Sequence, residues 1–335
     1  MKVLITGGAG FIGSSFVRYM LREHPNSEVT NLDKLTYAGN LENLEDIQNE
    51  PRHRFMKGDI ADGGRIDELL REGFEVIVNF AAESHVDRSI LDPSPFIETN
   101  IKGTHILLEG ARRYKVGRFI QVSTDEVYGS LGPEGKFTED CPMLPNSPYA
   151  ASKAAADLLC RAYWCTYTLP VIITRCCNNF GPNQFPEKLV PLVITNALED
   201  KEIPIYGDGL NVRDWIYVEE HCRALDLIIR RGKPGEIYNI GVNNEKTNLE
   251  LVKYILNTMG KPHSLMRFVA DRPGHDRRYA LDTAKIEREL GWNPTISFEE
   301  AIVKTIQWYI ENEASWRRIK SGEYLEYYER MYLQR

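Results

Sequence analysis

Short apolar runs alternate with longer stretches of helical character over the first half of the chain. Runs typical of buried strands lie at 3–5, 28–32, 54–56, 76–78, 119–122 and 171–174. A parallel sheet is buried on both faces, so its strands are apolar throughout and helices connect them. The alternation therefore predicts a doubly wound parallel α/β sheet.

The remaining patterns predict a second, smaller C-terminal lobe. Helical patterns follow the first glycine turn to about residue 22, start again from about residue 65, and recur near the ranges 95–114, 149–167, 189–198, 219–230, 250–259 and 298–335. The helix at 95–114 places Ile97, Ile101, Ile106, Leu107 and Leu108 on one side. The stretch 175–184 is amide-rich and loop-like, which predicts a boundary. We expect domains at 1–177 and 178–335, with parts of about 212–240 returning to the first.

Composition excludes several classes of protein. Apolar residues are 42% and charged residues 27%, which is typical of soluble globular proteins. The net charge of −7 comes without a clustered basic face, so neither nucleic acid nor an anionic membrane is expected as the main partner. Four glycines by position 13 break any signal-peptide helix, and no run approaches a membrane span. The six cysteines show no metal-binding spacing, which predicts free thiols in the cytoplasm.

A glycine turn follows the first predicted strand and opens the first predicted helix. Gly8, Gly10 and Gly13 match the dinucleotide fingerprint, and Gly7 with Gly10 and Gly13 matches a wider-spaced variant. Asp33 lies twenty residues after Gly13, where an acid accepts hydrogen bonds from a ribose and repels a 2′-phosphate. The combination predicts a Rossmann-type site for NAD; the alternative is a core turn with an ordinary surface Asp.

Polar residues also follow the third and fourth predicted strands. Asp59 is placed either to meet the adenine edge or to cap the next helix. Ala81 and Ala82 leave room for a cofactor to pass, and Ser84 and His85 offer polar contacts beyond it. A lone His is more often structural than catalytic, so we treat His85 as a binding candidate only.

The most informative stretch joins the fifth predicted strand to the helix at 149–167. Thr124, Asp125 and Glu126 lie at the carboxyl end of the strand, where α/β sheets bind ligands. Neighbouring strand residues point to opposite faces, so both carboxyls serve one site only if the strand has already turned. Tyr149 and Lys153 share a helix face, and an ammonium beside a phenol favours a phenolate base. The alternative is an acidic turn beside an ordinary helical Tyr.

Basic residues in the C-terminal half are candidates for neutralising a diphosphate. Guanidinium groups match phosphate oxygens well. These residues are Lys188, Arg213, Arg272, Arg277 and Arg278. The alternative is that they form a solvated charged surface.

Several motifs, taken together in their order along the chain, resemble those of one family. They are the glycine turn, 33–36, 81–89, 124–129, 149–153, 178–182, 186–189 and 272–275. The chain resembles the nucleotide-sugar branch of the extended short-chain dehydrogenase/reductases, and within it most closely the 4,6-dehydratases. The Thr-Asp-Glu triplet carries the resemblance to the dehydratases. Ala150, Phe180 and Asn183-Gln184 depart from the usual pattern, which bears on the choice of nucleobase.

The resemblance implies NAD-dependent dehydration of dTDP-glucose to dTDP-4-keto-6-deoxyglucose, with NAD tightly bound and regenerated. Tyr149 takes the O4 proton, Lys153 lowers the Tyr149 pKa and binds the nicotinamide ribose, and Thr124 hydrogen-bonds O4. Glu126 removes the C5 proton and Asp125 protonates the departing C6 hydroxyl. The alternatives are dehydration of another nucleoside-diphosphate glucose, a nucleotide-sugar 4-epimerase, and a non-catalytic protein that binds NAD(H) or a nucleotide sugar.

The resemblance also implies binding residues and an assembly. The cofactor set is Gly7, Gly10, Phe11, Ile12, Gly13, Asp33, Lys34, Leu35, Thr36, Asp59, Ile60, Ala81, Ala82, Thr99 and Asn179. The substrate set is Ser84, His85, Asn178, Lys188, Leu189, Pro204, Tyr206, Arg213, Asn248, Arg272 and His275. The domain at 178–335 then binds the nucleotide sugar. A homodimer through a four-helix bundle is expected, with apolar Leu158, Leu159, Tyr163 and Trp164 beyond the core-facing stripe.

Overall fold

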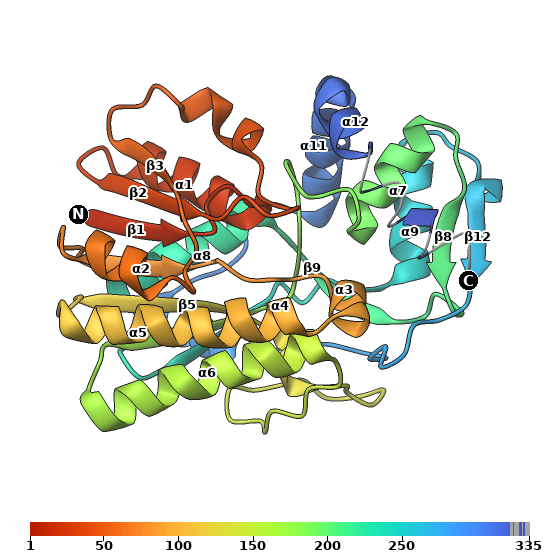
Figure 1. Cartoon of the computed structure of the whole chain (residues 1–335). Coiled ribbons are helices and arrows are strands. Elements are labelled where there is room, and N and C mark those ends of the chain that lie inside the picture. Colours follow the sequence, from red (N-terminus) through yellow and green to blue (C-terminus); the bar gives the residue numbers. More distant parts are fainter. Residues whose placement is uncertain (322–323, 325–327, 330, 332–335) are drawn as a thin grey trace.

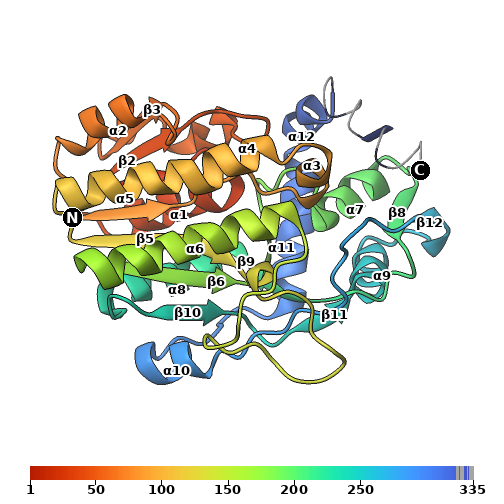
Figure 2. The same cartoon turned by 60° about the horizontal axis from the view of Figure 1, so that its bottom comes forward.

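The computed structural model describes residues 1–321, 324, 328–329 and 331. Two lobes lie side by side, and in Figures 1 and 2 the strand arrows of the larger lobe point toward the smaller one. The last part of the helical tail expected at 298–335 lies outside the described residues.

The main sheet confirms the predicted doubly wound fold. In the described residues it has seven strands, all parallel, in the order β10-β6-β5-β4-β1-β2-β3. Its strands are β1 (Lys2–Thr6), β2 (Glu28–Asp33), β3 (His53–Lys57), β4 (Val76–Asn79), β5 (Arg118–Thr124), β6 (Val171–Cys176) and β10 (Ile237–Ile240). The order reverses between β1 and β4, and such a reversal creates a ligand-binding crevice at the carboxyl edge.

Helices cover both faces of this sheet. On one face lie α1 (Phe11–Glu23) and α8 (Val218–Arg231), and on the other lie α2 (Gly63–Leu70), α5 (Thr104–Arg113) and α6 (Pro148–Tyr167). Side chains of β1 alternate between two hydrophobic clusters, with Val3 and Ile5 in one and Leu4 in the other. This alternation is the period of a strand buried on both faces.

The helix predicted at 95–114 contains a π-helical segment that changes which residues it buries. It consists of α4 (Ser94–Phe96), the π segment Ile97–Gly103 and α5. The expected single apolar side is wrong, because Ile97 is 57% exposed while Leu107 and Leu108 are buried. A π turn adds a residue to the helical repeat, so the positions before and after it no longer share a face.

The smaller lobe packs short sheets against helices. Its helices are α7 (Leu189–Leu198), α9 (Asn248–Thr258), α11 (Phe298–Glu311) and α12 (Glu313–Ile319), and its strands are β7 (Asn178–Phe180), β8 (Ile203–Tyr206), β9 (Val212–Tyr217), β11 (Glu245–Thr247) and β12 (Met266–Val269). The loop expected at 175–184 is wrong in part, because β6 continues through Cys176 and β7 pairs with β9. Such a short strand forms only through its partner, which no local pattern predicts.

Other helical segments connect these elements. They are α3 (Val86–Leu91), α10 (Ala284–Leu290) and three 3₁₀ turns, at Leu41–Ile47, Asp125–Tyr128 and His263–Leu265. The 3₁₀ turn after β5 is the local change of direction that the two adjacent carboxyls require.

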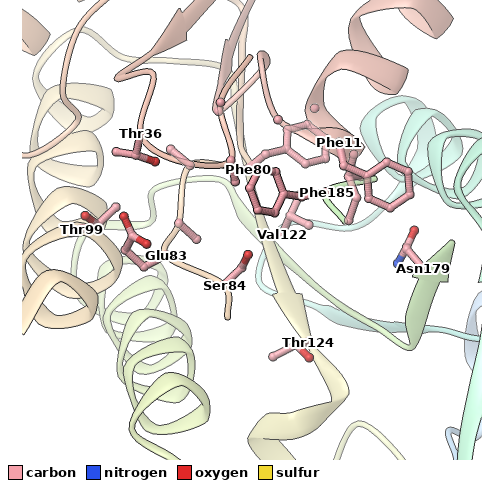
Figure 3. A pocket seen from close by; sticks show the side chains of 18 of the residues that line it. Phe11, Thr36, Phe80, Glu83, Ser84, Thr99, Val122, Thr124, Asn179 and Phe185 are labelled. Carbon is pink, nitrogen blue, oxygen red and sulfur yellow. The ribbon is translucent and has the colours of Figure 1, made fainter. Parts of the chain in front are cut away.

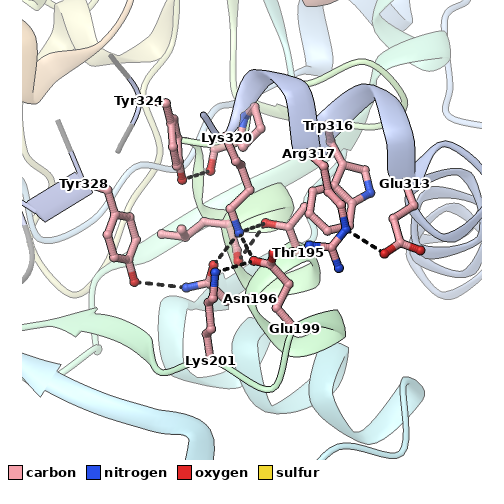
Figure 4. A network of polar contacts seen from close by, with 12 residues as sticks. Thr195, Asn196, Glu199, Lys201, Glu313, Trp316, Arg317, Lys320, Tyr324 and Tyr328 are labelled. Atoms are coloured by element: carbon pink, nitrogen blue, oxygen red, sulfur yellow. Dashed lines mark hydrogen bonds and ion pairs between the residues drawn. The ribbon is translucent and has the colours of Figure 1, made fainter. Parts of the chain in front are cut away.

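A buried lysine ties the end of the described chain to α7. The Nζ of Lys320 donates to Asn196 Oδ1 at 2.9 Å and to Glu199 Oε2 at 2.7 Å (Figure 4). Glu199 also pairs with Arg317 of α12 at 2.6 Å. Since Lys320 is 8% exposed, its charge is stabilised by these contacts rather than by water.

We expect Lys320→Met to lower the free energy of unfolding by about 1–3 kcal/mol, because it leaves buried acceptors without their donor. The matched control is Lys304→Met, which removes a half-exposed pair with Glu300 on α11. That change is expected to stay within about 0.5 kcal/mol. Urea unfolding of both variants measures the difference, and equal midpoints would show that the Lys320 network does not stabilise the lobe.

Candidate active site

A pocket lies between the lobes at the carboxyl edge of the main sheet (Figure 3). Residues expected to hold the cofactor line it: Gly7, Gly10, Phe11, Ile12, Gly13, Asp33, Lys34, Thr36, Asp59, Ile60, Ala81, Ala82, Thr99 and Asn179. Thr124, Glu126, Tyr149 and Lys153 also line it, as do Ser84, Asn178 and Lys188. Residues from both lobes therefore meet in one cavity.

The glycine turn forms a cradle that has no room for side chains. A Cβ on Gly13 would lie 2.2 Å from the carbonyl oxygen of Gly7, and one on Gly7 would lie 2.6 Å from the Ala81 amide. Gly8 is not in the lining; a Cβ there would meet the Asn31 side chain at 2.2 Å. The wider glycine spacing is therefore the one that faces the pocket. The first amides of α1 have no side-chain cap, so they are free for an anion.

Asp33 lies beside the cradle at the end of β2. Its Oδ2 accepts from the Ala9 amide at 2.9 Å, and its Oδ1 accepts from the Leu35 amide at 2.8 Å. Burial raises the pKa of Asp33, and the two amides oppose that shift. The side chain of Leu35 does not line the pocket. Its backbone amide holds Asp33, and the residue adopts a left-handed conformation with φ 57°.

Asp59 faces the pocket and does not cap α2. The cap is Asp62, whose side chain accepts from the Arg65 amide at 3.1 Å. Asp59 instead accepts from the Ala61 amide and pairs with Lys34 at 2.7 Å. The capping alternative for Asp59 is therefore wrong, because the helix begins at Gly63.

The two adjacent carboxyls have different electrostatic surroundings. Burial raises the pKa of Asp125 well above its usual range, and the Glu126 carboxylate raises it further. Burial also raises the pKa of Glu126, but Arg272, Lys188 and Arg213 lower it. Asp125 is 2% exposed and is not in the lining, whereas Glu126 faces the pocket. The pKa of Asp125 is therefore raised further than that of Glu126, so Asp125 is the carboxyl that holds a proton more readily.

Tyr149 and Lys153 lie one turn apart on α6 and face the pocket together. The Nζ of Lys153 donates to the Val122 carbonyl at 2.7 Å, and burial lowers the pKa of Lys153 to about 8. The expected lowering of the Tyr149 pKa is not found in this structure. Burial raises that pKa, and the Glu126 carboxylate raises it further, because both disfavour a second anion.

Eight residues of the expected substrate set do not line the pocket. They are His85, Leu189, Pro204, Tyr206, Arg213, Asn248, Arg272 and His275. Two of them, Arg213 and Arg272, nevertheless act on Glu126 through their charge. Tyr206 and Arg272 both contact Asp87, at 3.1 Å and 3.6 Å. His275 pairs with Asp271, Leu189 packs on the core of the smaller lobe, and Asn248 begins α9.

Three of the five cations expected to neutralise a diphosphate pair with carboxylates outside the pocket lining, and one of them is Arg272 with Asp87. Arg277 contacts both oxygens of Asp208, at 2.8 and 3.0 Å, and Arg278 pairs with Glu245 at 2.8 Å. Neither Arg277 nor Arg278 lines the pocket, and their part in neutralising a diphosphate stays a prediction. Lys188, Arg213 and Arg272 are the cations whose charge reaches Glu126.

The pocket also includes residues that were not among the expected binding or catalytic residues. They are Leu32, Ala38, Gly39, Gly58, Phe80, Glu83, Val122, Ser123, Cys176, Cys177, Gln184, Phe185, Glu187 and His221. Phe80, Val122 and Ser123 lie at strand ends, a position that could have identified them. His221 comes from α8, and no local signal predicts it.

The fold and the cradle define a dinucleotide-binding α/β protein with a Tyr and Lys pair at the carboxyl edge of its sheet. The residues present fit NAD, because a Cβ on Gly7 or Gly13 would fill the glycine cradle and the carboxylate of Asp33 ends β2. No helix in the described part of the chain is long and apolar enough to cross a membrane.

Comparisons with known proteins agree with this class. The family described as "GDP-mannose 4,6 dehydratase" matches residues 4–305. The dTDP-glucose 4,6-dehydratase of Streptomyces niveus is 50% identical, over 96% of this chain and 97% of its own. The dTDP-glucose 4,6-dehydratase DesIV of Streptomyces venezuelae, solved with NAD and TYD bound, is 54% identical with a TM-score of 0.93, over 96% of this chain and all of its own.

A more distant solved structure shares the fold but is named for a different reaction. The UDP-glucose 4-epimerase of Thermus thermophilus, solved with NAD, is 31% identical with a TM-score of 0.86, over 93% of this chain and all of its own. The chain belongs to the dTDP-glucose 4,6-dehydratase family, an NAD-dependent branch of the short-chain dehydrogenase/reductases.

We expect Gly13→Ala to weaken NAD binding about ten- to a hundredfold, because relieving an overlap with backbone costs about 1–3 kcal/mol. Gly63→Ala is the control, since nothing lies within 4 Å of its added Cβ. The control should retain NAD and keep or slightly increase stability. Calorimetric titration with NAD measures both variants, and unchanged affinity of Gly13→Ala would show that the cradle tolerates a side chain.

Proposed function

We propose that dTDP-glucose reacts in the pocket between the lobes, where Thr124, Glu126, Tyr149 and Lys153 meet. The enzyme is a hydro-lyase that converts dTDP-glucose to dTDP-4-keto-6-deoxyglucose, in keeping with about 50% identity to dehydratases over nearly the whole chain. The observation that carries the proposal is the 3₁₀ turn after Thr124, because it places two adjacent carboxyls beside the Tyr and Lys pair.

The reaction needs a base for O4 and a base for C5. When bound, NAD supplies the acceptor for the C4 hydride and returns that hydride to C6. Tyr149 takes the proton of O4, Lys153 supplies the positive charge that favours the phenolate, and Thr124 hydrogen-bonds O4. The 4-ketone acidifies the C5 proton. Glu126, whose charge Arg272 and Lys188 stabilise, removes that proton and returns it to C5 when the hydride reaches C6.

Loss of the C6 hydroxyl needs an acid. Burial raises the pKa of Asp125 well above its usual range, and its Oδ1 accepts a hydrogen bond from the Thr124 hydroxyl at 3.2 Å. A protonated Asp125 delivers its proton to the departing hydroxyl, which leaves as water. The unequal shifts of the two carboxyls therefore match an acid and base division of the elimination.

We assign the binding roles by lobe. Residues 1–177, with the segment of about 212–240 that contributes α8 and β10, hold NAD, and 178–335 hold the nucleotide sugar. Lys188 and Asn178 from the second region line the same pocket as the glycine cradle, which supports this assignment.

Assembly and location are also proposals. The α5 and α6 helices pack against each other, and Leu158 on α6 is 55% exposed. Tyr163, by contrast, is buried, so it belongs to the core and not to an exposed patch. We propose a homodimer through a four-helix bundle of α5 and α6 from two copies. The six free cysteines support the cytoplasm as its location.

Asp125→Asn is expected to stop the reaction after oxidation, because Asn keeps the shape but supplies no proton. General acid catalysis is worth about a hundred- to ten-thousandfold, so elimination slows by that factor while C4 oxidation changes far less. Single-turnover absorbance should show NADH accumulating with a 4-keto-hexose. Neither NADH nor product in a folded variant that binds substrate would overturn the assignment of Asp125.

Tyr149→Phe is expected to give the opposite pattern, because without the O4 base no hydride is transferred. NADH should then not appear in a single turnover, although substrate still binds. The mass of the product formed by the parent enzyme distinguishes dehydration from epimerisation, since a C4 epimer has the mass of the substrate whereas dehydration removes one water.

Leu158→Arg is expected to raise the dimer dissociation constant about tenfold or more, because an apolar interface would have to bury a guanidinium. Val303→Arg on α11 is the control, since Val303 is similarly exposed at 53%. Light scattering across a dilution series measures both variants. A parent that is monomeric at every concentration would refute the dimer.

A further inference from the structure

A buried carboxylate on α6 has no part in the chemistry above. Asp157 lies four residues after Lys153, so the two side chains share one helix face one turn apart. Asp157 is 1% exposed and Lys153 is 4% exposed. A charge so deeply buried needs a partner of opposite sign.

Arg175 on β6 fixes one side of this carboxylate. Its Nε donates to Asp157 Oδ2 at 3.0 Å, and its guanidinium lies 4.7 Å from the Tyr128 ring centroid. The other oxygen, Oδ1, is buried, and Ser123 acts on this carboxylate as a hydrogen-bond donor. Burial raises the pKa of Asp157, and the charges of Arg175 and Lys153 lower it again. Arg175 therefore holds Asp157 in place and favours its charged form.

Lys153 is the buried cation on the same helix face as Asp157. Its Nζ donates to the Val122 carbonyl, which is neutral, and no carboxylate of the described residues lies within 4 Å of it. Burial lowers the pKa of Lys153 and the Asp157 carboxylate is the first influence that raises it again.

Other titratable groups near this part of α6 do not replace Asp157. On α6 itself these are Tyr149 and Cys160; Asp125 and Glu126 lie on the 3₁₀ turn packed against α6, and Arg175 lies on β6. Asp125 is favoured in its neutral form, and Arg175 carries the same charge as Lys153. Glu126 is surrounded by three other cations.

We propose that Asp157 is a positioning residue for hydride transfer: held by Arg175, its carboxylate keeps Lys153 in the cationic form that Tyr149 requires. The proposal rests on the proposed role of Lys153. Buried charges near Tyr149 then alternate in sign along one face of α6 and onto β6, from Lys153 to Asp157 to Arg175. Removing Asp157 would leave two buried cations beside each other.

Asp157→Asn tests the charge alone, because Asn keeps the size and an oxygen that accepts from Arg175. An anion raises the pKa of a nearby ammonium, so its removal should lower the Lys153 pKa from about 8 by one unit or more. Competitive acetylation of the full-length chain, freed of nucleotide and followed by peptide mass, reports that pKa directly. This readout is needed because Asp157 also disfavours the Tyr149 phenolate, as a lesser influence.

Asp226→Asn is the matched control. Asp226 is a buried carboxylate on α8 that pairs with Arg230 at 2.7 Å, outside the pocket lining. It should lower stability without moving the Lys153 pKa. Asp157→Ser keeps a hydroxyl acceptor for Arg175 and replaces Asp157→Asn in the test if the Asn variant does not fold.

A double-mutant cycle on the NAD-loaded enzyme shows whether Asp157 acts through Lys153. Asp157→Asn should slow single-turnover NADH formation in the parent about twofold at pH 7 and about tenfold at pH 9, because a fall of one unit from about 8 changes the cationic fraction of Lys153 tenfold only above both pKa values. In a Lys153→Met background it should have little further effect.

Two results would overturn the proposal: an unchanged Lys153 pKa in Asp157→Asn, or an equal loss of rate in both backgrounds. If Lys153→Met alone leaves hydride transfer intact, the assigned role of Lys153 fails instead. The acetylation experiment still decides, in that case, whether Asp157 sets the charge of Lys153.

Discussion

The site depends on all strands of the main sheet running in one direction. Their carboxyl ends meet at one edge, so Gly7 after β1, Asp33 at the end of β2, Ala81 after β4 and Thr124 at the end of β5 line one pocket. These residues are spread over more than a hundred positions of the chain. The fold brings them together because parallel strands require crossover helices, which return the chain to the same starting edge.

Burying several ionisable groups in that pocket is the main energetic constraint. Two negative charges on neighbouring carboxyls are unfavourable, because like charges repel. The cations of the smaller lobe stabilise the charge of Glu126, whereas burial raises the pKa of Asp125. The same constraint acts on α6, where Asp157 lies between the charges of Lys153 and Arg175. The protonation states in this site thus depend on which buried groups have partners of opposite charge.

The amino-acid sequence determined the local elements of this protein. Apolar runs with a strand or helix period predict six of the seven strands of the main sheet, all but β10, and the helices near 149–167 and 189–198, because burial selects side chains along one element at a time. The glycine cradle and the turn at Asp125 were also predictable, since a backbone without room for Cβ and a change of strand direction are local requirements. The resemblance of several ordered motifs then indicated the reaction.

Only the tertiary structure decided which charges are paired and which face the pocket. Arg213 and Arg277 look alike in the sequence, yet Arg213 acts on Glu126 whereas Arg277 is held by Asp208. Asp62 rather than Asp59 caps α2, and β7 exists because β9 lies beside it. Arg175 meets Asp157 from a different element. Periodicity reports whether a residue is buried, but the partner of a buried charge comes from a distant segment, and packing alone selects it.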